Sequence, residues 1–518
     1  MALKIILLVL FFGSMVAIGL YCRRHATDVN GFVLGGRQVG PWLTAFAYGT
    51  SYFSAVVFVG YAGQFGWKYG IAATWAGIGN ALLGSLLAWV VLGRRTRIMT
   101  QHLNTATMPE FFEKRFDSTP LKLAAAVICF VLLIPYTASL YNGLSRLFGM
   151  AFNLDYSICV IVMAVLTGIY VIAGGYMATA INDFIQGIIM LFGIVAVIAA
   201  VIGSKGGLSA ALAGLAQVTD ETGATELARS PGVFNSFFGP DPLNLLGVVI
   251  LTSLGTWGLP QMVQKFYAIK NEGAVSKGTI ISTIFAFVIA GGCYFLGGFG
   301  RLFSEDINIA TNGYDSVIPT MLSGLPDILI ALVIILVLSA SMSTLSSLVL
   351  TSSSTLTLDL IKDRFVKDMD EKRQVFIMRI LIVVFILISV IIAIVQYTTN
   401  VTFIAQLMGV SWGGLAGAFL APFLYGLYWK RTTKAACWTT FGFSMVITLA
   451  NLFFRSAFPA ILQSPINCGA FTMLVSLILV PIVSLVTPAP DKALVDGCFA
   501  CYEEKVLVSA KTALEDQQ

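Results

Sequence analysis

The stretch Leu338-Ser-Ala-Ser-Met-Ser-Thr-Leu-Ser-Ser347 lies inside a continuous apolar run, residues 328–350, that is long enough for a helix buried in a membrane. On such a helix Ser343 and Thr344 are adjacent and Ala340 lies one turn earlier, so two hydroxyls and a backbone carbonyl can converge on one point. Oxygen ligands on a dry helix face suit a desolvated alkali cation. The same residues also permit a structural role, because Ser and Thr in membrane helices often hydrogen-bond to their own helix and small residues let helices pack closely.

The composition of the 518 residues indicates a membrane protein. Hydrophobic residues make up 57% of the chain and charged residues 11%, whereas soluble proteins carry about 25% charged residues. Apolar runs of roughly 20 residues recur along the whole length, and we count about thirteen of them. These runs are continuous, unlike the short alternating strands of a membrane barrel. We therefore predict an all-α polytopic membrane protein.

Basic and acidic loops alternate along the chain. Arg23 and Arg24 follow the first apolar run, and the basic stretch 94–118 follows the third, whereas the loops around Asp220 and Glu305 are acidic. The positive-inside rule then predicts an N-terminus outside the cell membrane and a C-terminus in the cytoplasm. The charge order also indicates a retained first span and not a cleaved signal peptide. Because the basic residues lie in loops, the net charge of +5 requires no nucleic-acid partner, and no obligate protein partner is implied.

Two predicted spans have middles rich in glycine, proline and small polar residues. The second span, 41–65, contains Gly49-Thr-Ser51, and the seventh, 243–266, contains Gly255-Thr-Trp-Gly-Leu-Pro260. They are five spans apart, so the units that begin at them have opposite orientations. This is the pattern of an inverted repeat whose broken helices form a site near the middle of the membrane, and it favours a carrier over a passive channel. The predicted division is a first span with its loop (1–40), a first repeat unit (41–203), an outer loop (204–242), a second repeat unit (243–429), two further spans (430–487) and a cytoplasmic tail (488–518).

Four motifs resemble the sodium:solute symporter family. They are Leu34-Gly-Gly-Arg-Gln-Val-Gly-Pro41, Asn182-Asp-Phe-Ile-Gln-Gly187, Gly258-Leu-Pro260 with Lys265-Phe266, and Met342-Ser-Thr-Leu345. The likeness runs in register from about residue 4 to residue 485 and is greatest to the sodium/proline and sodium/pantothenate branches. It implies the five-plus-five inverted-repeat fold of the leucine-transporter type. It also implies sodium-driven uptake, in which sodium is carried with the solute.

The resemblance implies a sodium site, and the breaks suggest a solute site beside it. The sodium ligands would be the carbonyls of Thr50, Phe53 and Ala340 and the hydroxyls of Ser343 and Thr344. The expected solute contacts are Tyr52, Ser54, Tyr136, Trp257 and Gln261, of which Tyr136 matches a tyrosine near the solute in the proline branch. The aromatic residues would alternatively pack or lie near an interface, and Gln261 would alternatively cap the backbone freed by Pro260.

Two charged residues in the spans also match family positions. Asp183 matches an aspartate linked with the ion pathway, although it would also suit a helix N-terminus. Lys265 falls where both branches carry a basic residue. In contrast, Cys498 and Cys501 form a lone CxxC, which is a weak metal or redox signal.

The chain departs from the proline branch at three positions. It has Tyr52 where that branch has aspartate, and Val56 and Thr252 where that branch has tryptophan. The missing aromatics favour a different solute, and Thr252 leans toward the pantothenate branch, while a small carboxylate-bearing solute such as proline or pantothenate fits either. The alternatives are a proton-coupled carrier of a short monocarboxylate and, more distantly, a membrane enzyme. We expect no enzyme, because Ser343 has no histidine available and the spans contain almost no acids.

Overall fold

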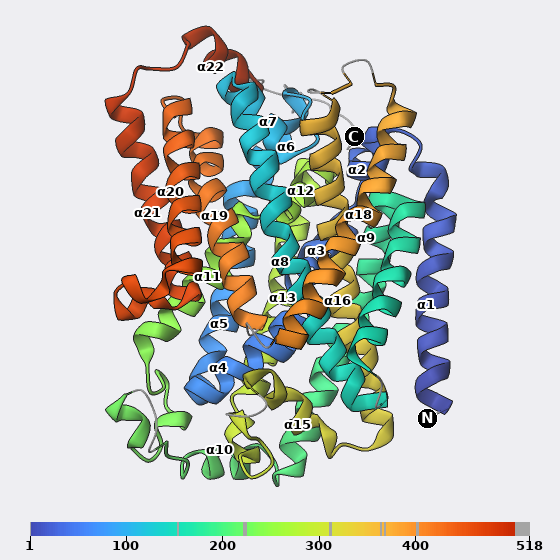
Figure 1. The fold of residues 1–518 in the computed structure, drawn as a ribbon, viewed down its shortest axis with the longest axis vertical. Coiled ribbons are helices and arrows are strands. Elements are labelled where there is room, and N and C mark those ends of the chain that lie inside the picture. Colours follow the sequence, from blue (N-terminus) through green and yellow to red (C-terminus); the bar gives the residue numbers. More distant parts are fainter. Residues whose placement is uncertain are drawn as a thin grey trace, which may run out of the picture.

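Long apolar helices run side by side along the longest axis of the molecule (Figure 1). The computed structural model describes residues 2–152, 155–220, 225–309, 313–362, 365–366, 369–399 and 404–502. Within these ranges, nine helical segments are long and apolar enough to cross a membrane, and a bent pair would make a tenth. The predicted all-α polytopic architecture is therefore confirmed.

Two of the nine segments are much longer than one membrane crossing. They span Val56–His102, with 47 residues, and α9 (Tyr156–Ser204), with 49. At 1.5 Å per residue each is about 70 Å long, roughly twice the thickness of a bilayer core. Each is interrupted by a glycine with positive φ, at Gly70 (62°) and Gly175 (55°). A Cβ at Gly70 would also lie 2.1 Å from the carbonyl oxygen of Phe234. With each of these segments counted as two spans, and with the bent pair and α1 (Ala2–Cys22) included, the described helices account for the predicted number of about thirteen spans.

The first predicted broken helix is interrupted at Phe53, two residues beyond the expected Gly49-Thr-Ser51. Helix α3 (Pro41–Tyr52) ends, Phe53 is extended, and the chain resumes as a π-helix, η3 (Val56–Tyr61), followed by α4 (Ala62–Tyr69). The restart is local in origin, because the Ser54 hydroxyl accepts a hydrogen bond from the Val56 amide at 3.2 Å, as an N-cap residue does.

The second broken helix consists of α11 (Pro242–Gly258) and α12 (Pro260–Ala268), whose axes differ by 47°. Pro260 has no N–H to continue the preceding helix, and its ring disfavours a helical conformation at Leu259. Leu259 accordingly adopts φ −80° and ψ 120°. Both interruptions therefore fall in the second and seventh predicted spans.

Helix α16 (Asp327–Thr355) runs through the middle of the bundle, beside α8, α9 and α18 in Figure 1. Every residue from Val333 to Thr355 is buried except Ile335. Its hydroxyl-rich half therefore faces protein on all sides. The other helices that build the bundle are α2 (Val29–Leu34), α5 (Thr74–Gly79), η5 (Asn80–Leu87), α8 (Thr119–Phe152), α13 (Glu272–Gly297), α18 (Glu371–Thr399), α19 (Ile404–Tyr428), α20 (Lys434–Phe453) and α21 (Pro465–Val486).

The two ends of the bundle differ in charge. One end carries the short helices α6 (Arg94–His102), α7 (Met108–Phe116) and α22 (Lys492–Phe499), and we call it the basic end because of Arg94, Arg95, Arg97, Lys114 and Arg115. The opposite end carries α10 (Leu208–Leu215) and α15 (Val317–Ser323) (Figure 1). We call it the acidic end because of Asp220, Glu226, Glu305 and Asp306. Helix α1 starts at the acidic end.

Candidate functional site

Four oxygen atoms from α3 and α16 converge in the middle of the bundle. The Ser343 hydroxyl lies 3.1 Å from the carbonyl oxygens of both Thr50 and Ala340, and the Thr344 hydroxyl makes the same two contacts at 3.1 Å. All four residues are at most 2% exposed. We call this group the four-oxygen cluster. The sequence-based expectation that the hydroxyls and the Ala340 carbonyl meet near Thr50 therefore agrees with the geometry.

The carbonyl of Thr50 is free to accept these contacts because α3 ends two residues later. The last carbonyls of a helix have no partner within the helix. The Thr50 side chain bonds backwards to the Phe46 carbonyl at 2.8 Å and leaves its own carbonyl directed at α16. Phe53 lines the same small cavity as Ala340, with a volume of about 10 Å³, so the fifth predicted ligand residue lies beside the cluster.

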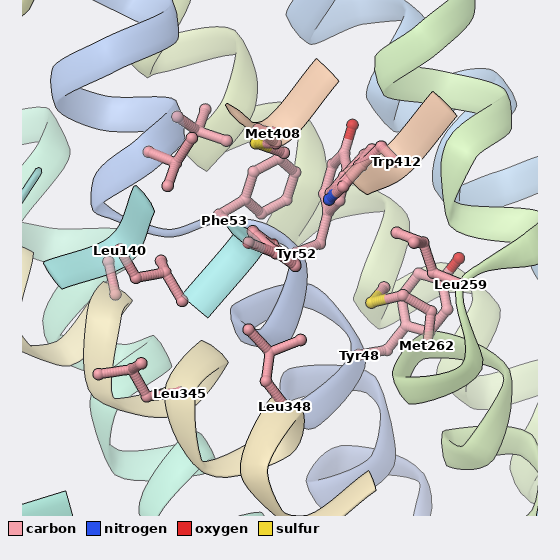
Figure 2. Packing of buried hydrophobic residues seen from close by; sticks show 14 of the residues in the cluster. Tyr48, Tyr52, Phe53, Leu140, Leu259, Met262, Leu345, Leu348, Met408 and Trp412 are labelled. Carbon is pink, nitrogen blue, oxygen red and sulfur yellow. The ribbon is translucent and has the colours of Figure 1, made fainter. Parts of the chain in front are cut away.

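An aromatic group lies next to the α3 break. The rings of Tyr52 and Trp412 are 5.4 Å apart, and the rings of Tyr136 and Trp412 are 5.8 Å apart and nearly perpendicular. Figure 2 shows Tyr52, Phe53 and Trp412 gathered around the end of α3. The Tyr52 hydroxyl donates to the Thr252 carbonyl. Tyr52 and Tyr136 are two of the expected solute contacts, whereas Trp412 was not among them.

Several buried polar groups near this aromatic group make no well-formed hydrogen bond with the described residues. They include the hydroxyls of Tyr61, Tyr136 and Tyr294, the Asn80 side-chain nitrogen and the Trp412 indole nitrogen. Tyr136 lies within hydrogen-bonding reach of Trp412 and Ser54, and Tyr294 lies within reach of Asn80 and Thr252. Tyr294 lies near Tyr52, Tyr61 and Asn80, and Tyr61 lies near Tyr136. We call these five residues the donor cluster. Buried polar groups are almost always bonded, so a group of unsatisfied donors in one place indicates a site for an acceptor-bearing ligand.

The other predicted solute contacts differ in the hydrogen bonds that they make within the protein. Gln261, in the first turn of α12, is 1% exposed, and neither atom of its amide has a partner within the described chain. Ser54 caps the restarted helix and lies near the Tyr136 hydroxyl. The Trp257 indole instead donates to the Leu83 carbonyl at 2.9 Å, which fits the packing alternative.

Asp183 lies well inside α9, about two turns beyond the kink at Gly175. A helix dipole acts within the first turn, so the N-terminal alternative is not supported. The Asp183 carboxylate is completely buried and interacts electrostatically with Lys265 on α12. Tyr176 lies against both, and the Lys265 Nζ atom is 5.1 Å from its ring centre.

The basic end of the bundle is closed by backbone and arginine hydrogen bonds. Arg37 donates to the carbonyls of Tyr267 at 3.2 Å and Thr105 at 2.5 Å. The Val39 amide donates to the Ala268 carbonyl at 3.2 Å, and the Lys270 amide donates to the Val39 carbonyl at 3.0 Å. Burial, together with the charge of Arg97, lowers the pKa of Arg37 to about 10, so this arginine remains charged at pH 7.

The acidic end instead contains a cavity of about 1360 Å³. Its lining includes Gln64 and Phe65 on α4, Val248 on α11 and Asn467 on α21. The Phe65 ring lies 4.9 Å from the ring of Tyr61. Phe65, which lines this cavity, thus contacts Tyr61 of the donor cluster.

Residues 32–441 match the profile of the Sodium:solute symporter family, which is more than three quarters of the chain. The chain belongs to the sodium:solute symporter family. It is therefore a transporter of a family that couples solute symport to sodium, and not an enzyme, as the sequence motifs predicted.

Curated relatives of this symporter include two proline transporters. The chain is 28% identical over 439 residues to the osmoregulated proline transporter OpuE of Bacillus subtilis, covering 84% of this chain and 86% of that protein. It is 30% identical over 440 residues to the sodium/proline symporter of Staphylococcus aureus, covering 83% and 82% respectively.

Solved structures show the fold of the symporter. A substrate-bound, outward-open structure of a Na⁺-coupled sialic acid symporter is similar, with a TM-score of 0.72 at 16% identity over 94% of this chain and 99% of that one. MhsT in complex with L-phenylalanine has a TM-score of 0.51 at 13% identity, over 86% and 98% of the two chains. The expected inverted-repeat fold of the leucine-transporter type is thus confirmed.

The residues that sequence reasoning missed belong to the donor cluster. Trp412 lies on α19, Asn80 on η5, Tyr61 on η3 and Tyr294 on α13. One signal was available, because Asn80 is a polar residue inside an apolar span, and such residues are costly and mark functional sites. The aromatic residues gave no comparable signal.

Proposed function

We propose that this symporter imports a small carboxylate-bearing solute together with sodium by alternating access. The observation that carries the proposal is the four-oxygen cluster, in which two hydroxyls of α16 meet the Thr50 carbonyl of the broken helix α3. Two carbonyl and two hydroxyl oxygens in a dry environment are the hard, neutral ligands that a monovalent cation prefers. No carboxylate is needed for a single positive charge.

Sodium at this point would hold α3 against α16. Hydroxyls can rotate, so Ser343 and Thr344 would turn their lone pairs to the ion and give up their bonds to the Thr50 and Ala340 carbonyls. One charge that moves across 100 mV yields about 2.3 kcal/mol, which helps to drive solute accumulation.

The donor cluster supports a solute with a carboxylate. Its tyrosine hydroxyls, the Asn80 amide and the Trp412 N–H are donors, and a carboxylate is an acceptor with several lone pairs. The N-terminal ends of the two restarted helices, near Ser54 and Pro260, would add partial positive charge at the two breaks. Proline transport by relatives at about 30% identity is consistent with a solute of this size.

The two ends of the bundle support an outward-facing arrangement. The positive-inside rule assigns the basic end to the cytoplasm. In this orientation the hydrogen bonds of Arg37 and Val39 close the inner side, and the cavity beside Phe65 opens to the outside. Solute would enter through this cavity and displace the Phe65–Tyr61 contact.

The test is uptake of labelled solutes into proteoliposomes, with and without an inward sodium gradient. The panel contains proline, other neutral amino acids, pantothenate and short monocarboxylates. Ser343→Ala and Thr344→Ala are compared with the parent and with Ser353→Ala, a control on the same helix whose hydroxyl bonds only to the Leu350 carbonyl at 3.0 Å.

We expect sodium-dependent uptake of one solute class that falls in both cluster variants and persists in the control. Uptake that ignores sodium and both substitutions would contradict the sodium site. Uptake driven by a proton gradient alone would favour the proton-coupled carrier, and tracer counterflow would distinguish any carrier from a pore.

A further inference from the structure

Helix α12 is a short, completely enclosed element between the solute site and the closed basic end. All nine of its residues, Pro260 to Ala268, are buried. Its first turn contains the unsatisfied Gln261, and its last residues supply the carbonyls that accept from Arg37 and Val39. A movement of α12 would therefore change both the solute site and the hydrogen bonds that close the basic end.

Lys265 connects the middle of α12 to the sodium region. Its ammonium group donates to the Ser347 hydroxyl at 2.9 Å, and the Ser347 and Ser51 hydroxyls lie 2.7 Å apart. Ser51 directly follows Thr50, and Ser347 lies one turn beyond Ser343. Three helices, α12, α16 and α3, are thus joined by hydrogen bonds immediately beside the four-oxygen cluster.

The far end of α12 is fixed at the basic end chiefly through its backbone carbonyls, and the Tyr267 hydroxyl also donates to the Thr107 carbonyl at 3.5 Å. Its last carbonyls accept from Arg37 and from the Val39 amide, as described above. Arg97 donates to the carbonyls of the next two residues, Ile269 and Lys270, with the latter contact at 3.2 Å. The position of α12 therefore decides whether these bonds can form.

The charge of Lys265 is balanced inside the protein. Asp183 is completely buried and makes no hydrogen bond with the described residues, and Lys265 is its electrostatic partner. A buried ammonium and carboxylate cost more desolvation energy than a well-packed apolar pair of the same volume. Packing alone does not require a lysine at this position.

We propose that Lys265 is a positioning residue that transmits sodium occupancy of the four-oxygen cluster to the closure at the basic end. Sodium fixes α3 against α16, and this brings Ser51 and Ser347 to the spacing at which Ser347 accepts from Lys265. Lys265 then holds α12 in the position that allows Arg37, Val39 and Arg97 to close the basic end. Release of sodium frees the serine pair, the link to α12 weakens, and the basic end opens. This inference rests on the proposed sodium-coupled function.

The test is hydrogen–deuterium exchange of the full-length protein in lipid nanodiscs, in sodium and in choline buffer. The readouts are the peptides that contain the Val39 and Lys270 amides, which are hydrogen-bonded across the closed basic end in this structure. Binding of ²²Na⁺ to the same samples is measured in parallel. The variants are Lys265→Met, Lys265→Arg, Ser347→Ala and, as a control, Lys277→Met, which changes an exposed lysine of α13.

In the parent and in Lys277→Met, sodium should slow exchange of both amides about tenfold or more. In Lys265→Met this slowing should disappear. Because coupling between sodium binding and closure is reciprocal, ²²Na⁺ affinity should fall by no more than the same factor, and sodium binding should persist. Lys265→Arg should restore most of both effects, and Ser347→Ala, which leaves all charges in place, should lose most of them. Solute uptake by Lys265→Met should show a reduced maximal rate and a sodium half-saturation raised by no more than the same factor.

Equal slowing by sodium in Lys265→Met and in the parent would overturn the proposal. It would also be overturned if the parent binds ²²Na⁺ and sodium does not slow exchange. A parent that binds no sodium would instead contradict the proposed function itself.

Discussion

The Thr344 hydroxyl on α16 lies 3.1 Å from the carbonyl oxygen of Thr50 in the last turn of α3. Almost 300 residues separate the two positions in sequence. The contact exists for two reasons. Helix α3 stops at Tyr52, which leaves the Thr50 carbonyl without a helical partner. Helix α16 passes beside this carbonyl and directs the Thr344 hydroxyl at it. A cation that binds here would join the first repeat unit to the second.

Thr344→Ala should weaken sodium activation of transport. Removal of one hydroxyl ligand costs about 1–3 kcal/mol, which corresponds to a rise of roughly 5- to 150-fold in the sodium concentration for half-maximal uptake. Thr344→Ser keeps the oxygen and should stay close to the parent. The measurement is initial uptake rate against sodium concentration at saturating solute. A Thr344→Ala curve that superimposes on the Thr344→Ser curve would remove Thr344 from the sodium ligands.

Tyr136→Phe should weaken solute binding and leave stability unchanged. The Tyr136 hydroxyl makes no well-formed hydrogen bond within the described chain, although Trp412 and Ser54 lie within reach, so its loss should leave stability close to that of the parent. A lost bond to a charged carboxylate costs about 1.5–3 kcal/mol, or a rise of roughly 10- to 150-fold in the solute concentration for half-maximal uptake.

The matched control is Tyr48→Phe. The Tyr48 hydroxyl donates to the Gly84 carbonyl at 2.8 Å, so this variant should lower the thermal midpoint and leave the solute half-saturation nearly unchanged. Thermal unfolding in detergent and uptake kinetics together separate the two effects. A stability loss in Tyr136→Phe with an unchanged half-saturation would indicate a packing role.

The fold and the four-oxygen cluster were predictable from local sequence, whereas most of the donor cluster was not. The break at Leu259 follows from Pro260, and the hydroxyls of α16 are visible in a single apolar run, so both signals lie within a few residues. Trp412 and Tyr294 look like ordinary membrane aromatics, because their unsatisfied groups become apparent only when η3, η5, α8, α13 and α19 are packed together. The same holds for the Lys265–Ser347 contact, which joins separate spans.

Gly297→Ala should strongly destabilise the symporter, because α13 and α4 touch through their backbones. A Cβ at Gly297 would lie 2.0 Å from the Ala62 carbonyl oxygen, and one at Gly66 would lie 2.0 Å from the Gly297 carbonyl. Backbone cannot move aside as a flexible side chain does, so we expect a loss of about 3 kcal/mol or more. Gly291→Ala on the same helix meets no atom within 4 Å and should be neutral or stabilising by about 0.5–1 kcal/mol. Thermal midpoints in detergent provide the comparison, and equal midpoints for the two variants would contradict the close approach.

Arg37→Ala should loosen the closure of the basic end even when sodium is present. Arg37 bonds to the carbonyls of Tyr267 and Thr105, and hydrogen bonds to a charged group contribute about 1.5–3 kcal/mol each. Loss of one such contribution should speed exchange of the Val39 and Lys270 amides roughly 10- to 150-fold. Arg24→Ala, which changes an exposed arginine whose side chain lies on Tyr21, serves as the control.

Arg37→Ala acts on the closure directly, whereas Lys265→Met acts on its link to sodium. Exchange in Arg37→Ala should therefore be fast in both buffers and still slow somewhat with sodium, because Lys265 continues to hold α12 through Ser347. Exchange in Arg37→Ala that matches the parent in both buffers would show that the backbone bonds of Val39 close the basic end without the arginine.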